Sequence, residues 1–128
     1  MSLTALSSIP QDEIKANLEV DLTDFFPGEE KVIVTFREPK IPDMYPNGSA
    51  IERLRISFPE MILDQLQSCY IIGRCYVRSD KDAQTMDPVK DICRLALRNK
   101  RAYLRIFSRF QEAFLVDFNT EIKESGNV

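Results

Sequence analysis

The side chains that most often perform chemistry in proteins are sparse in this chain. Its 128 residues include no histidine, which is the usual general base near neutral pH and the commonest metal ligand. Three cysteines, Cys69, Cys75 and Cys93, have spacings that match neither a zinc-binding pair nor a redox C-x-x-C motif. The acids easiest to imagine in an active site fall in patterns typical of a helix surface or a polar loop: Asp64, Asp80 and Asp82. We therefore expect buried cysteines, no catalytic residue, no metal and no cofactor.

Arginines recur at helical spacing in the second half of the chain. No acid stands between Asp91 and Glu112. On a helix, with about 100° per residue, five arginines fall within a sector of roughly 80°, opposite the face of Phe107, Phe110 and Phe114. They are Arg94, Arg98, Arg101, Arg105 and Arg109. A solvated helix face usually mixes both signs of charge, so we expect an acidic partner to cover this face, although plain solvation remains open.

The first 30 residues carry the opposite charge, with seven acids against Lys15 and a net charge of −6. The acids expected to meet the arginines are Glu19, Asp21, Asp24, Glu29 and Glu30. They would do so either head to tail in the next copy of the chain, which makes rings or open spirals, or by folding back on their own arginines. Nucleic acid is a weaker partner for this chain, since its net charge is −3 and its pI about 5.0.

Composition indicates an ordinary globular domain. The chain is 44% hydrophobic and 29% charged, close to the average for soluble proteins. Its longest nearly apolar run, residues 69–77, is interrupted by Gly73 and Arg74 and is far shorter than the roughly 20 residues of a membrane span. The start, MSLTALSSIPQDE, does not resemble a signal peptide. We expect a single domain, residues 1–128, located in the cytoplasm.

Alternating apolar and polar residues predict a β-hairpin near the start of the chain. The apolar positions flank the turn dipeptide Pro27-Gly28 and are Leu18, Val20, Leu22, Val32, Val34 and Phe36. On the outer face, Glu19 and Asp21 are expected to pair with Lys31 and Arg37. Before the hairpin, Pro10 followed by acids predicts a short helix over residues 9–17.

The remainder of the chain is predicted to be helical. Residues 38–48 hold three prolines and form an irregular connector, after which Ser49 caps a helix that begins at Ala50. A central, strongly apolar helix follows from Pro59. Asp87 and Pro88 start the last helical region, with a break favoured at Asn99. The fold class is thus mainly α, with an N-terminal segment (1–43) that holds the hairpin and connector, a helical core (49–118) and a flexible tail (119–128).

This order of parts resembles the tail assembly chaperones of long-tailed, lambda-like bacteriophages (siphoviruses). The resemblance spans roughly residues 17–118 and is carried by VTFREP, MILDQLQSCYIIGRCYV and FSRFQEAF. It implies a non-enzymatic protein of the host cytoplasm, absent from the mature virion, that self-associates, coats the tape measure protein and recruits the major tail protein of the tail tube. Client contacts would use Tyr45 and exposed edges of the face of Phe107, Phe110 and Phe114, although a core role for these phenylalanines is favoured. The alternative is a small helical nucleic-acid-binding protein that uses the arginine face.

Overall fold

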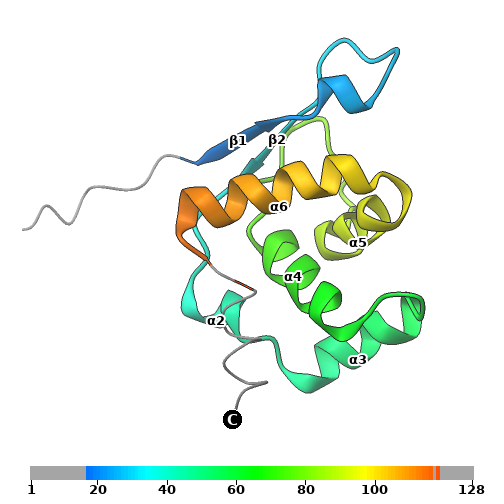
Figure 1. Ribbon diagram of the computed structural model, residues 1–128, viewed down its shortest axis with the longest axis vertical. Coiled ribbons are helices and arrows are strands. Elements are labelled where there is room, and N and C mark those ends of the chain that lie inside the picture. Colours follow the sequence, from blue (N-terminus) through cyan, green and yellow to red (C-terminus); the bar gives the residue numbers. More distant parts are fainter. Residues whose placement is uncertain (1–16, 117, 119–128) are drawn as a thin grey trace, which may run out of the picture.

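Five α-helices and a two-stranded hairpin make up the part of the chain that the computed structural model describes, residues 17–116 and 118 (Figure 1). In chain order the elements are β1 (Leu18–Asp21), the 3-10 helix η1 (Thr23–Phe25), β2 (Ile33–Phe36), α2 (Ile41–Met44), α3 (Gly48–Ser57), α4 (Leu63–Arg74), α5 (Pro88–Arg98) and α6 (Lys100–Phe114). The predicted class, mainly α with an N-terminal hairpin, is confirmed. The predicted tail 119–128 and, apart from Asn17, the predicted helix 9–17 lie outside the described residues.

The hairpin buries one face against the helices and is extended by a third segment. β1 and β2 are antiparallel, with Leu18 opposite Phe36. The Phe36 ring is fully buried and meets the ring of Phe110 edge to face. Beyond β2, Val77 N–H donates to the Thr35 carbonyl at 2.9 Å and Arg37 N–H donates to the Cys75 carbonyl at 2.8 Å. The segment that follows α4 therefore joins the sheet edge to the helical core.

Arg37 does not make the cross-strand pair that the sequence predicted. Within the sheet, Thr35 lies opposite Glu19 and Ile33 lies opposite Asp21, so that expectation is wrong. Arg37 lies just past the end of β2, and its Nη1 binds Asp43 Oδ2 at 2.7 Å. Asp43 lies in the connector and is buried. A buried carboxylate needs a cation nearby, and Arg37 supplies it.

Asp43 is only 3% exposed and ties three parts of the chain together. Besides Arg37, its carboxylate accepts from Lys40 N–H at 2.9 Å and lies 3.5 Å from Arg74 Nε. Burial alone would raise the pKa of Asp43. The hydrogen bonds from Arg37 and Lys40 and the nearby charges of Arg37 and Arg74 outweigh burial, and hold this pKa below its ordinary value. The ion pairs thus hold α2 against β2 and the end of α4.

Two of the predicted helix starts are wrong. Asn47, not Ser49, caps α3. Its side chain accepts from Ala50 N–H at 2.8 Å, and the helix begins at Gly48. α4 begins at Leu63 rather than at Pro59, since Phe58 and Met61 both turn into the core and the chain between them forms a turn. Ile62, the N-cap of α4, is consequently 68% exposed.

The last helical region begins and divides as predicted. Asp87 caps α5 by accepting from Lys90 N–H at 3.3 Å, with Pro88 in the first turn. Asn99 is the break: its N–H donates to the Leu95 carbonyl at 2.8 Å and its side chain accepts from Ala102 N–H at 3.2 Å. It therefore closes α5 and opens α6.

The core is centred on α4, as predicted, and all three cysteines are buried there (Figure 1). Burial raises the pKa of the Cys75 thiol to about 12. α5 crosses α4 at Gly73, where an added Cβ would stand 2.5 Å from Val89 Cα. Only glycine therefore permits this crossing.

Replacing Gly73 by alanine should force α4 and α5 apart. We expect the free energy of unfolding to fall by about 2 kcal/mol, the typical cost of overpacking, as measured by urea denaturation. Gly48→Ala is the matched control, because a Cβ there meets no atom within 4 Å; it should leave stability unchanged or raise it by up to about 1 kcal/mol. Equal effects of the two changes would contradict the close helix crossing.

Replacing Asp43 by asparagine should destabilise the protein by about 2 kcal/mol near neutral pH. Because the pKa of Asp43 is lowered on folding, its contribution is present above the unfolded pKa and is lost as the pH falls through the folded value. Urea denaturation near pH 7 and near pH 3 should therefore show the difference between Asp43→Asn and the unaltered chain narrowing in acid. Glu52→Gln, which breaks only the exposed pair with Arg55, should change little at either pH.

Candidate protein-binding surface

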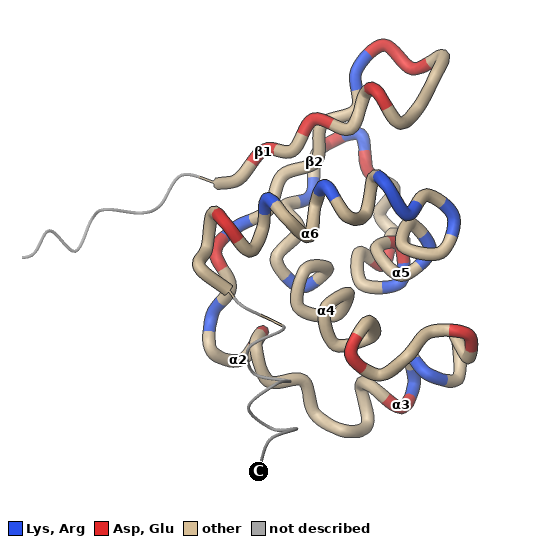
Figure 2. The backbone as a smooth tube through the Cα atoms, in the orientation of Figure 1, with Lys and Arg blue, Asp and Glu red and all other residues tan. Residues whose placement is uncertain are grey.

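The five predicted arginines all lie exposed on α5 and α6, and we call them the basic row: Arg94, Arg98, Arg101, Arg105 and Arg109. The turn at Asn99 divides the row, so that the first two belong to α5 and the other three to α6. Figure 2 shows basic residues along α6 and around the turn that joins it to α5. The row is thus present, but it is not the single straight stripe of one helix.

Two members of the basic row have partners within the chain. Arg94 Nη1 binds Asp91 Oδ1 at 2.6 Å. Arg105 donates to the Asp21 carbonyl at 3.3 Å and places its guanidinium 4.8 Å from the centre of the Phe25 ring. Between described residues, no ion pair reaches Arg98, Arg101 or Arg109. Within the described part of the chain, three positive charges of the row are therefore left without an ion pair.

The acidic hairpin lies beside the basic row. Asn99 Nδ2 donates to the Phe25 carbonyl at 3.1 Å, which places η1 on the turn between α5 and α6. Of the two arrangements that the sequence left open, the hairpin takes the one that is folded back beside the arginines of its own subunit. Apolar packing explains this position, because Phe25 and Phe26 are half-buried against the core. A count of charges does not take that packing into account.

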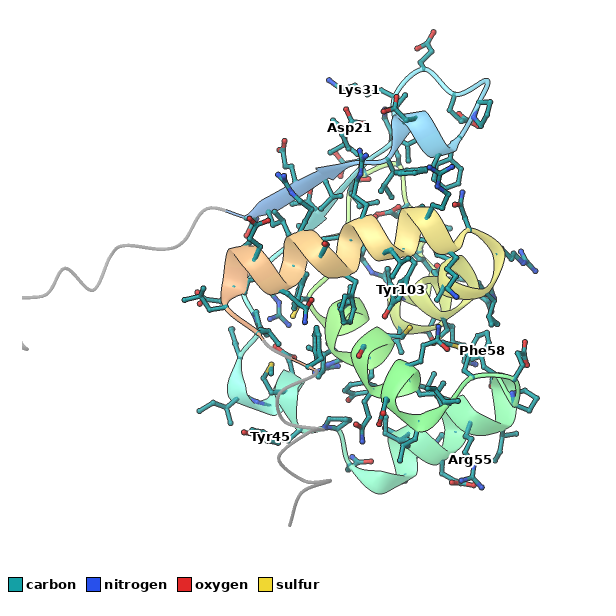
Figure 3. All side chains as sticks on the ribbon, in the orientation of Figure 1. Asp21, Lys31, Tyr45, Arg55, Phe58 and Tyr103 are labelled. Atoms are coloured by element: carbon teal, nitrogen blue, oxygen red, sulfur yellow. The ribbon has the colours of Figure 1, made fainter. Side chains whose placement is uncertain are left out.

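The five predicted acids differ in their surroundings. Asp21 accepts from Thr23 Oγ1 at 2.6 Å and from Thr23 N–H at 2.9 Å. These bonds, and more weakly the charges of Lys31 and Arg105, lower the pKa of Asp21; Figure 3 shows Asp21 and Lys31 on the hairpin. Glu19 is exposed on β1. The remaining three surround the hairpin turn, exposed and without an ion pair to any described residue, and we call them the acidic tip: Asp24, Glu29 and Glu30.

The charges at the start of α6 work against its stability. Lys100 and Arg101 are its first two residues, and its first turn holds no acid. The N-terminus of a helix carries partial positive charge, so cations there are unfavourable. Arg101, Arg105 and Arg109 also repel one another at spacings of four. These cations therefore do not stabilise the fold, and we attribute them to binding of a partner.

Exposed apolar side chains accompany the basic row. Leu97 is 40% exposed and Leu104 50%, each between arginines of the row. The charge pattern does not indicate these two leucines, although both lie off the buried stripe in a helical-wheel projection. Of the expected client-binding residues, Tyr45 is 70% exposed (Figure 3), whereas the phenylalanine face belongs mainly to the core. A mixed basic and apolar surface suits a protein partner with acidic and apolar side chains.

Comparison of this chain with protein-family models, with curated proteins and with solved structures finds no match. None of the helices in residues 17–116 is long and apolar enough to cross a membrane. Across the same described part of the chain, no three cysteine, aspartate or glutamate side chains gather as metal ligands would.

Because Arg101 has no ion pair with any described residue, reversing its charge should stabilise the fold. Arg101→Glu places an acid in the first turn of α6 and removes a repulsion, so we expect the free energy of unfolding to rise by about 0.5 kcal/mol. Arg94→Glu, which instead breaks the pair with Asp91, should lower it by a similar amount. Thermal and urea unfolding of both variants test this, and a loss of stability in Arg101→Glu would show that Arg101 is already paired.

Proposed function

We propose that this protein is a tail assembly chaperone of a long-tailed bacteriophage: a non-enzymatic subunit that self-associates and coats the tape measure protein while the major tail protein is recruited. One observation carries the proposal. Among residues 17–116, charges of both signs are left without an ion pair: Arg98, Arg101 and Arg109 on the helices, and the acidic tip on the hairpin.

Partners outside the subunit, both the client and further copies of the chain, supply the missing counter-charges. Arginines that destabilise α6 in the single subunit gain partners when an acidic protein surface covers them. The acidic tip likewise gains cations from a neighbour. A subunit whose acidic tip binds a neighbouring copy while its basic row binds the client can repeat along a long client, as a coat requires.

The client surface we propose is the basic row with Leu97 and Leu104. A helical segment of the tape measure protein that bears acidic residues beside an apolar stripe would contact both kinds of side chain. Tyr45 and Ile41, both largely exposed on and next to α2, offer a second apolar contact.

The nucleic-acid alternative gains no support from the arrangement of charges. The acidic tip and Asp21 belong to a hairpin that rests on the turn of the basic row, so a phosphate backbone laid along the row would meet carboxylates. Steeply salt-dependent binding to DNA or RNA that is abolished in Arg101→Glu would nonetheless favour this alternative over the chaperone.

Two measurements test the chaperone proposal. Sedimentation of the unaltered chain at rising concentration should reveal oligomers that dissociate as salt rises, because charge contacts are screened over about 8 to 10 Å at ordinary ionic strength. Co-expression with a tape measure protein should keep that client in solution. The variant Arg101→Glu with Arg109→Glu should lose this effect, whereas Arg55→Glu with Lys81→Glu, of equal net charge, should retain it. A monomer at every concentration that leaves the client insoluble would refute the proposal.

A further inference from the structure

A cleft of about 320 Å³ lies between α3, the second half of α4 and the first turn of α5. Its lining includes Arg53, Tyr70, Arg74, Asp87, Val89 and Lys90. Each of the three helices contributes one cation, so no periodic pattern in the sequence predicts that these three cations lie together. We call it the basic cleft.

The charges of the basic cleft are positive on balance. Its one carboxylate, Asp87, is engaged in capping α5 through Lys90 N–H. Arg74 is 3.5 Å from Asp43, but that carboxylate is shared with Arg37. Between described residues, Arg53 and Lys90 make no ion pair. The cleft can therefore accept carboxylates from outside the chain.

The walls of the basic cleft are fixed in place. The close crossing of Gly73 and Val89 sets the separation of α4 and α5, and the buried Leu54 anchors α3 beside them. Ion pairs that form in a preformed hollow are less exposed to water than those on a convex helix face, and are correspondingly stronger.

The acidic tip is the complementary surface of the same chain, and it lies far from the basic cleft. Figure 1 shows the hairpin turn at the top of the molecule and α3 at the bottom. The tip of one subunit therefore cannot reach its own cleft, but can enter the cleft of another. The basic row, by contrast, adjoins the tip, so two copies paired through tip and row would contact each other reciprocally and stop at a dimer.

We propose that the basic cleft receives the acidic tip of a second copy of this chain, in a head-to-tail contact that repeats without closing at two subunits. The proposal deepens the function proposed above and rests on its self-association. It assigns self-contact to the basic cleft and leaves the basic row to the client.

Paired charge reversals test the contact by sedimentation at low salt. Arg53→Glu with Lys90→Glu, and separately Glu29→Lys with Glu30→Lys, should each raise the apparent dissociation constant of the oligomers by about tenfold or more. Mixing the two variants should restore assembly, because each tip then meets a cleft of opposite charge. Recovery on mixing also shows that both variants are folded. Arg55→Glu with Lys81→Glu has the same net charge as the cleft variant, alters no residue of the cleft, and should assemble like the unaltered chain.

The outcomes separate this inference from the proposed function. If the unaltered chain forms oligomers that the cleft variant forms equally well, or if growth stops at a dimer, the basic cleft is not the receptor and the chaperone proposal survives. If the unaltered chain is a monomer, a peptide of residues 22–32 is titrated onto it and followed by NMR. Shifts at the cleft that Arg53→Glu with Lys90→Glu abolishes would support the contact, and their absence would overturn it.

Discussion

Asn99 is the residue on which the arrangement of the whole surface depends. Its N–H closes α5 on the Leu95 carbonyl, its Oδ1 opens α6 through Ala102 N–H, and its Nδ2 holds the Phe25 carbonyl of the hairpin. One side chain thus sets the turn between two helices and the position of the hairpin over it. Because α6 starts afresh there, the cations that follow fall at its positive end, and the charge of this surface becomes available to a partner.

Features that depend on neighbouring residues could be predicted from the sequence. The hairpin follows from alternation on both sides of Pro27-Gly28, and the start of α5 from Asp87-Pro88. Where two residues close in sequence suit the same role, local rules could not choose between them: Asn47 and Ser49 are about equally good caps. The start of α4 was missed for a different reason, since Phe58 and Met61 reach the core only if the chain turns between them.

Features that depend on contacts between distant residues could not be predicted from the sequence. The types of side chain on the candidate surface were predictable, as charge patterns show arginines and acids directly. Their placement was not, because contact between Arg105 and Phe25 depends on how the hairpin packs, and the basic cleft takes single cations from three helices. The chemical character of the site therefore came from the sequence, and its geometry from the fold. Under the proposed self-association, that geometry decides between a closed dimer and an open head-to-tail assembly.

The backbone pairing of β2 with residues 75–77 has a mechanical consequence. An isolated two-stranded ribbon is at best marginally stable, but here Thr35 and Arg37 are bonded to the segment that leaves α4. Tension applied at the hairpin turn would therefore pass into the central helix instead of peeling the ribbon away. In a filament linked through such turns, load would pass from each hairpin into the hydrophobic core of its own subunit.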